Sequence, residues 1–335
     1  MSVKRILCTA LFVATATGAG AQEKVAFGTN WLAQAEHGGY YQAVADGTYA
    51  ACGLEVTIVP GGPQVNNRAL MLAGKIDFHM GGNLLQPFSA VQEGVPVVAV
   101  AANFQKDPQV LLTHPGAVSS FAGIADLDKM IVGDSGFQSF YQWMMADYGF
   151  AAEKRVPYTF NPAPFIADER SAQQGYVTSE PFAVEQQGGF KPDVWMLADA
   201  GFSTYATIIE TMQSTINERP EAVKCFVEGS AIGWANFLYG DNAAALDLIK
   251  AANPEITDEQ MAFSINALKE YGVVDSGDAL TMGIGAMTDA RVEDFYNKMV
   301  AAGVTPAGID YKAAYTLDFA NTGASLPVKK ALTGQ

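Results

Sequence analysis

Short apolar runs of strand length alternate with helical stretches through most of this chain, and this alternation limits the folds that it can adopt. The expected strands are residues 24–29, 54–59, 76–80, 95–101, 110–113, 130–133, 173–178 and 194–197. The expected helices between them include 36–46, 65–73, 84–92 and 139–148. Strands that alternate with helices are typical of α/β proteins, in which helices cover both faces of a sheet. We therefore expect an α/β fold with mostly parallel strands.

The pattern becomes helical after Pro220, with expected helices at 221–238, 242–252, 258–271 and 290–301. A chain of 335 residues is long for one core and suits two lobes. We expect the helical tail to return to the first lobe, so that the chain crosses between lobes near 103–108 and near 198–203. The predicted divisions are a signal segment, 1–21, a discontinuous lobe 1, 22–105 and 201–335, and a lobe 2, 106–200.

The N-terminus has the three parts of a cleaved secretory signal. Lys4 and Arg5 are positive, residues 6–17 are apolar, and Ala19 and Ala21 occupy the small positions before a cleavage site. The apolar run is shorter than the roughly 20 residues that span a bilayer. A buried N-terminal helix is the alternative interpretation. We expect export, with cleavage near Ala21.

Charge and motifs exclude several classes of function. The net charge of −15 at pH 7 would repel nucleic acid phosphates, so no nucleic acid partner is expected. His37, His79 and His114 do not have the spacing of metal ligands. The sequence contains no phosphate-binding loop and no nucleophile elbow. We expect neither a metal, nor a cofactor, nor an enzymatic activity.

Removal of the signal segment would leave two cysteines, Cys52 and Cys225. A single pair in an oxidising compartment is a disulfide candidate. Two free buried thiols are the alternative, and the sequence does not decide between them.

Nine short segments between residues 24 and 250 keep the order and spacing of a known family. They are Asn30-Trp31, His37–Tyr40, Gly47–Tyr49, Gly53–Val56, Gly61-Gly62, Gly74–Phe78, Gly94–Val97, Gly175–Pro181 and Asn217–Val227. The chain thereby resembles the solute-binding proteins of ABC importers, in the branch for thiamine-pyrimidine precursors, riboflavin, sulfonates, taurine and nitrate.

The resemblance implies a type II periplasmic-binding-protein fold, with two lobes, two crossovers and a ligand cleft between them. It implies a periplasmic protein that delivers a small molecule to the permease and ATPase subunits of an importer, and we expect a monomer. A sensory receptor subunit is an alternative role. A pyrimidine-synthesising enzyme on this fold is another, but its lysine, histidine and cysteines are absent from 81–86 and 199–203.

The first ligand candidates follow the first expected strand, because ligands of open α/β sheets bind at the carboxyl ends of strands. Trp31 offers a flat face to a ring, and Asn30 offers a donor and an acceptor. Trp31 could instead be a core residue. His37 could bond a ligand or cap the helix that carries Tyr40.

Glu180 also follows an expected strand. A carboxylate there suits amino or ring N–H donors and repels nitrate or a sulfonate. The other candidates are turn residues with available backbone amides and aromatic residues near the crossovers: Gly62, Gly82, Asn83, Gly136, Phe137, Gln138, Phe104, Phe202 and Tyr205. Each of these aromatic residues could instead serve packing.

The Asn30-Trp31 start with His37 looks nearer to the pyrimidine-precursor members of the family. We therefore expect a nitrogen heterocycle of pyrimidine type, such as a hydroxymethylpyrimidine or formylaminopyrimidine precursor of thiamine. Riboflavin, or taurine, alkyl sulfonates or nitrate, are the alternative ligands.

Overall fold

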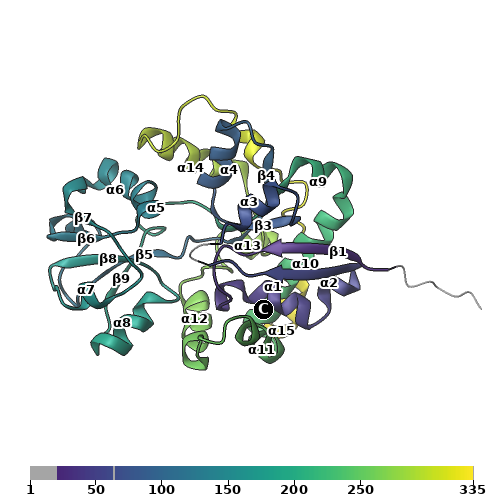
Figure 1. Cartoon of the computed structure of the whole chain (residues 1–335), viewed down its shortest axis with the longest axis horizontal. Coiled ribbons are helices and arrows are strands. Elements are labelled where there is room, and N and C mark those ends of the chain that lie inside the picture. The colour runs from purple at the N-terminus through teal and green to yellow at the C-terminus, as the bar shows by residue number, and fades with distance from the viewer. Residues whose placement is uncertain (1–20, 63–64, 335) are drawn as a thin grey trace, which may run out of the picture.

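The computed structural model describes residues 21–62 and 65–334 (Figure 1). The predicted signal segment lies outside the described residues except for Ala21. Two five-stranded sheets, with strand orders β2-β1-β3-β10-β4 and β7-β6-β8-β5-β9, organise this part of the chain. The first sheet contains β1 (Glu23–Gly28), β2 (Leu54–Val59), β3 (Phe78–Asn83), β4 (Val97–Phe104) and β10 (Ala206–Met212). The second contains β5 (Gln109–Thr113), β6 (Lys129–Ile131), β7 (Arg155–Val156), β8 (Ser171–Tyr176) and β9 (Asp193–Met196).

Both sheets are mixed, and the prediction of mostly parallel strands holds for all but one strand in each sheet. Strand β10 runs antiparallel to β3 and β4, and β5 runs antiparallel to β8 and β9. The reason is topological. Each of these strands enters its sheet directly from the other sheet, without the crossover helix that a parallel neighbour within one sheet requires.

Helices cover each sheet, as the α/β prediction required. Four helices accompany the second sheet: α5 (Asp134–Phe137), α6 (Phe140–Tyr148), α7 (Ala163–Ile166) and α8 (Glu180–Gly188). Early helices of the first sheet are α1 (Gly38–Ala45), α2 (Thr48–Ala51), α3 (Asn67–Leu72) and α4 (Leu85–Gln92), with a 3₁₀ turn η1 (Ala35–His37) before α1. The predicted helices 36–46, 65–73, 84–92 and 139–148 correspond to η1 with α1, to α3, to α4 and to α6.

The helical tail begins after β10, and its predicted helices are confirmed to within one residue at each end. It consists of α9 (Gln213–Glu218), α10 (Pro220–Tyr239), α11 (Ala243–Ala252), α12 (Asp258–Glu270), α13 (Ala279–Met282), α14 (Asp289–Ala301) and α15 (Ser325–Thr333). Helix α10 packs on α1 and α15, which places the tail beside the first sheet (Figure 1). We call the elements around the first sheet lobe 1 and those around the second lobe 2. The exact lobe boundaries stay a prediction.

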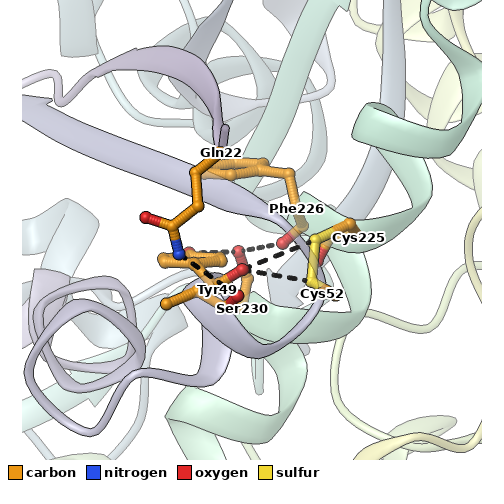
Figure 2. Close-up of a disulfide and its surroundings, with 7 residues drawn as sticks. Gln22, Tyr49, Cys52, Cys225, Phe226 and Ser230 are labelled. Carbon is orange, nitrogen blue, oxygen red and sulfur yellow. Dashed lines mark hydrogen bonds between the residues drawn. A yellow bond between two sulfur atoms is a disulfide. The ribbon is translucent and has the colours of Figure 1, made fainter. Parts of the chain in front are cut away.

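A disulfide joins the two halves of lobe 1 (Figure 2). It links Cys52, at the end of α2, to Cys225 in α10, with the two Cα atoms 5.9 Å apart. Beside it, the hydroxyl groups of Tyr49 and Ser230 are 2.8 Å apart, and the Tyr49 ring stacks on Phe226 at 5.2 Å. The bridge therefore lies over a packed aromatic contact between α2 and α10.

Helices α1 and α10 contact each other through glycine. A Cβ atom on Gly233 would lie 2.2 Å from the carbonyl oxygen of Gly39 and 2.8 Å from the Cβ of Ala43. The helices must separate to admit it, so we expect Gly233→Ala to lower the free energy of unfolding by about 1–3 kcal/mol in a urea titration. A Cβ on Gly123 has no neighbour closer than 3.5 Å, so Gly123→Ala is the control. Equal effects of the two changes would contradict close glycine packing.

Within the described residues, no helix has both the length and the apolar character needed to cross a membrane.

Candidate functional site

Contacts between the lobes gather polar and aromatic side chains from several strand ends. The Trp31 ring, which follows β1, lies 5.4 Å from the ring of Phe160 in lobe 2. Glu36 in η1 accepts a hydrogen bond from the hydroxyl of Thr178, which follows β8. We call the following set the inter-lobe cluster: Trp31, Glu36, Asn83, Asp107, Tyr158, Phe160, Tyr176, Thr178 and Glu180.

Glu36 is an unusual buried acid. Its side chain is 3% exposed, and its second oxygen, Oε2, has no hydrogen-bond partner among the described residues. Burial raises the pKa of Glu36 to about 7, although the hydrogen bond from Thr178 limits the rise. A buried acceptor without a partner is costly, so Oε2 is suited to a donor supplied from outside the chain.

Glu180 begins α8 and is held by lobe 2. Its Oε2 accepts the backbone N–H of Tyr176 at 2.7 Å, and its Oε1 accepts the hydroxyl of Tyr158 at 3.2 Å. Burial raises the pKa of Glu180, and its charge also raises that of Glu36. The two carboxyl groups, one from each lobe, therefore share one electrostatic environment.

Asp107 is a third buried acid, on the segment that leaves lobe 1. Its Oδ1 accepts the backbone N–H of Gln109 at 3.0 Å, and its Oδ2 accepts the amide of Asn83 at 3.3 Å. Burial raises the pKa of Asp107 to about 6. The pKa of Tyr176 is raised by burial first and then by the nearby charge of Asp107. Tyr176 thus connects Asp107 to the pair of glutamates.

No lysine or arginine in the described residues pairs with any of these three acids. Carboxyl groups in that situation stay protonated or await a cationic or N–H donor. Aromatic rings connect to Glu180 through Tyr158, which donates to Glu180 and packs on Phe160 at 5.2 Å, and Phe160 in turn contacts Trp31 of the other lobe. The arrangement is suited to holding a flat molecule that carries N–H groups, and it would disfavour an anion.

A groove of about 290 Å³ lies between α8 and α12, and no residue of the inter-lobe cluster lines it. Helix α12 also contacts lobe 2 directly, because the hydroxyl of Ser264 donates to the carbonyl oxygen of Thr178 at 2.7 Å. The groove is lined by Val177, Pro181, Glu185, Lys191, Pro192, Val194, Phe263, Asn266, Ala267, Glu270 and Tyr271.

Three predicted ligand residues, Trp31, Asn83 and Glu180, belong to the inter-lobe cluster. Asn30 precedes Trp31 and is half-buried. Phe137 contacts Tyr141 at 5.2 Å, beside buried Gly136 and exposed Gln138, and the short helix α5 that carries Gly136 and Phe137 lies on the side of lobe 2 toward lobe 1 (Figure 1). The roles of all these residues stay predictions.

Other predicted residues are occupied elsewhere. The hydroxyl of Tyr40 accepts the amide of Asn103 at 2.8 Å, and the backbone N–H of Gly82 donates to Gln86 at 2.7 Å. His37 is fully buried, and burial lowers its pKa to about 3, so the ring is neutral. Neither of its ring nitrogens has a partner among the described residues.

The aromatic residues near the crossovers are also fully buried. Phe104 contacts Trp234 at 5.4 Å, and Phe202 contacts Trp143 and Phe295 at 5.4 and 5.3 Å. The structure does not bring Phe104, Phe202 or Tyr205 into the inter-lobe cluster. Gly62, at the edge of the 63–64 gap, lies beside Leu32 and Val65. A ligand role for these residues stays a prediction.

Sequence reasoning missed Glu36, Asp107, Tyr158, Phe160, Tyr176 and Thr178. Tyr176 and Thr178 lie inside the segment Gly175–Pro181, which carried the resemblance, so their neighbourhood was a usable signal. Asp107 lies inside the predicted crossover 103–108. No local pattern marks Glu36 or Phe160, because their partners are more than 120 residues away.

Several known proteins are similar to this chain. The riboflavin-binding protein RibY of Chloroflexus aurantiacus is 27% identical over 321 residues, which cover 90% of this chain and 87% of RibY. The alkanesulfonate-binding protein SsuA from Xanthomonas axonopodis pv. citri, solved bound to MOPS, has a TM-score of 0.62 at 13% identity. The match covers 89% of this chain and 100% of SsuA. The desulfurization enzyme DszB has a TM-score of 0.58 at 12% identity. The match covers 92% of this chain and 99% of DszB.

At these low identities the solved structures show the fold alone. The chain has the periplasmic-binding-protein fold, as the sequence predicted. The model of the family described as NMT1/THI5-like matches residues 34–243, which is more than half of the chain. The chain belongs to the NMT1/THI5-like family.

Proposed function

We propose that this protein is the substrate-binding component of an ABC importer, exported to the periplasm, and that it captures a small nitrogen heterocycle with amino or ring N–H donors. A thiamine pyrimidine precursor is the favoured ligand. The observation that carries the proposal is the inter-lobe cluster, which contains three buried acids without a cationic partner, one of them linked through Tyr158 to aromatic rings from both lobes. Family membership and the similarity to RibY and SsuA support the transport role. Permease and ATPase subunits as partners, and a monomeric receptor, belong to the same proposal.

Riboflavin is the second candidate, because RibY is named as a riboflavin-binding protein. Its flat ring system would suit Trp31 and Phe160, and its ring N–H could donate to one carboxylate, but it has no amino group for the second acid of the pair. Taurine, alkyl sulfonates and nitrate are disfavoured, since an anionic group would meet Glu36 and Glu180 without a cation to offset them. DszB shows only that an enzyme can share the fold.

We expect Glu180→Gln and Trp31→Ala each to weaken binding of an aminopyrimidine about tenfold or more. Glu180 would lose a charge-assisted hydrogen bond, and Trp31 a stacking face. Isothermal calorimetry with 4-amino-5-hydroxymethyl-2-methylpyrimidine, riboflavin and taurine measures both effects. Glu185→Gln, five residues later on α8 and more exposed, is the matched control and should bind like the unchanged protein.

Mass spectrometry of small molecules released from the purified protein identifies the natural ligand. Tight binding of taurine or an alkyl sulfonate with no binding of aminopyrimidines would overturn the assignment of the ligand class. It would leave the transport role standing.

A further inference from the structure

Two short segments connect the lobes, and they lie beside each other. The first crossover, residues 105–108, joins β4 to β5, and the second, residues 197–205, joins β9 to β10. Lys106 of the first crossover pairs with Asp199 of the second at 2.8 Å. Any rotation of one lobe against the other must bend both crossovers.

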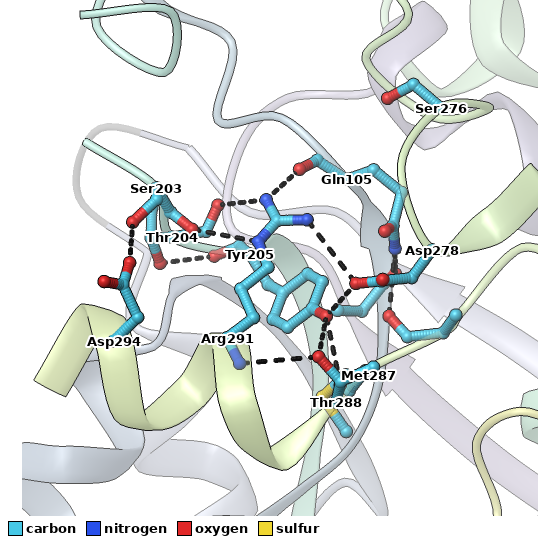
Figure 3. A network of polar contacts seen from close by, with 12 residues as sticks. Gln105, Ser203, Thr204, Tyr205, Ser276, Asp278, Met287, Thr288, Arg291 and Asp294 are labelled. Carbon is cyan, nitrogen blue, oxygen red and sulfur yellow. Dashed lines mark hydrogen bonds and ion pairs between the residues drawn. The ribbon is translucent and has the colours of Figure 1, made fainter. Parts of the chain in front are cut away.

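One guanidinium group holds the lobe 1 ends of both crossovers (Figure 3). Arg291 of α14 donates from Nη2 to the carbonyl oxygen of Gln105 in the first crossover. It donates to the carbonyl oxygens of Ser203, from Nε at 3.0 Å, and Thr204, from Nη2 at 3.2 Å, in the second. Because a guanidinium is planar and rigid, these bonds fix the separation of the two backbones.

Arg291 is itself held in place. Its guanidinium carbon lies 4.0 Å from the centre of the Tyr205 ring, and its Nη1 lies 3.8 Å from Asp278. The hydroxyl of Tyr205 donates to Asp278 and accepts the backbone N–H of Thr288 at 3.0 Å (Figure 3). The stacking and the ion pair together leave the guanidinium few alternative positions.

The second crossover has an additional anchor. Phe202 lies between α6 of lobe 2, through Trp143, and α14 of lobe 1, through Phe295. Helix α14 thus contacts the crossovers through both a polar and an aromatic group. Phe202 and Tyr205, which the sequence predicted as ligand candidates, both lie in this region.

We propose that Arg291 is a positioning residue of the hinge, which fixes the point where both crossovers leave lobe 1. Bending is then confined to the short stretches between Arg291 and lobe 2. The two lobes then rotate about one point. Each time they close, the hydrogen bond from Thr178 to Glu36 forms again. Without Arg291 the two crossovers bend independently, and the lobes no longer return to a single closed arrangement.

The inter-lobe distance tests the proposal without any ligand, so its outcome is independent of the proposed function. Spin labels are attached at two exposed positions, through Ala244→Cys in lobe 1 and Glu153→Cys in lobe 2. Pulsed electron paramagnetic resonance then measures the distance between the two labels. We expect Arg291→Met to shift the distance distribution to longer values and to widen it. Arg291→Lys, which keeps the charge but not the fork, should give an intermediate distribution and serves as the test if Arg291→Met does not fold.

Arg170→Met is the matched control. Arg170 pairs with Asp128 at 2.9 Å inside lobe 2 and is exposed, so its loss removes the same charge without touching a crossover. Its distance distribution should equal that of the unchanged protein. If both Arg291 variants also keep the unchanged distribution, the proposal is overturned, whatever happens to their melting temperatures.

Discussion

Removal of the Cys52–Cys225 bridge is expected to lower the free energy of unfolding by about 4–5 kcal/mol. The bridge closes a loop of great length, because the two cysteines are 173 positions apart in the sequence. In the chain-entropy account, a crosslink restricts the unfolded chain more as the enclosed loop grows, and this loop contains the whole of lobe 2. Urea titration of the double variant Cys52→Ala/Cys225→Ala measures the effect.

The double variant is preferable to either single change, since a single change would leave a free thiol. The unchanged protein with its disulfide reduced is the control, and it should show the same loss of stability. Thiol labelling of the unreduced, denatured protein should find neither Cys52 nor Cys225 free. Two labelled thiols, or a stability loss below about 1 kcal/mol, would contradict a stabilising bridge.

The stability of the protein is expected to fall between about pH 4.5 and pH 7 through Glu36. Its pKa is about 7 in the folded protein, raised by burial, against 4.5 for an ordinary glutamate. The folded state therefore binds more protons than the unfolded state in this range. Below pH 4.5 the Glu36 carboxyl group makes its full contribution to the free energy of unfolding. This contribution, about 3 kcal/mol, is lost as the pH rises through 7.

Other buried groups titrate in the same region, so Glu36 must be isolated by a variant. The raised pKa of Asp107, about 6, acts in the same direction. His37 acts in the opposite direction, since its lowered pKa of about 3 makes stability rise with pH up to its ordinary value of 6.5. Urea titrations at pH 5, 6, 7 and 8 should show a shallower decline for Glu36→Gln than for the unchanged protein. Glu185→Gln is the exposed control, and parallel pH profiles for all three proteins would refute the assignment.

Local sequence patterns predicted most of the helices and strands within each lobe. The strand 54–59 was predicted at its observed bounds because its apolar and polar residues alternate. Strand β10 was missed although it contains the run Thr207-Ile208-Ile209. Its Glu210 is fully buried in the strand, which is tolerable only because Arg68 and His79 lie within 3.1 Å of its carboxylate. Those partners come from α3 and β3, so the local sequence could not reveal them.

For each contact between the lobes, the sequence identified at most one of the two partners: Trp31 without Phe160, and neither Glu36 nor Thr178. Trp31 and Glu180 were identified because they follow strands, and strand ends are local features. Glu36 reads locally as a helix-start residue before two glycines. Its role depends on Thr178, which is 142 positions away and in the other lobe. The acids were therefore visible in the sequence, but their convergence was not.

The place of β10 in the first sheet has a consequence for the order in which the chain folds during its synthesis. Strand β10 lies between β3 and β4, which have no contact with each other in the sheet. A growing chain that ends before Ala206 already contains four strands of the sheet but lacks the one that joins them. Two unpaired strand edges then face each other, and lobe 1 cannot close its core until lobe 2 has been synthesised. Such a delay postpones folding of the nascent chain, which would suit the proposed export across a membrane before folding.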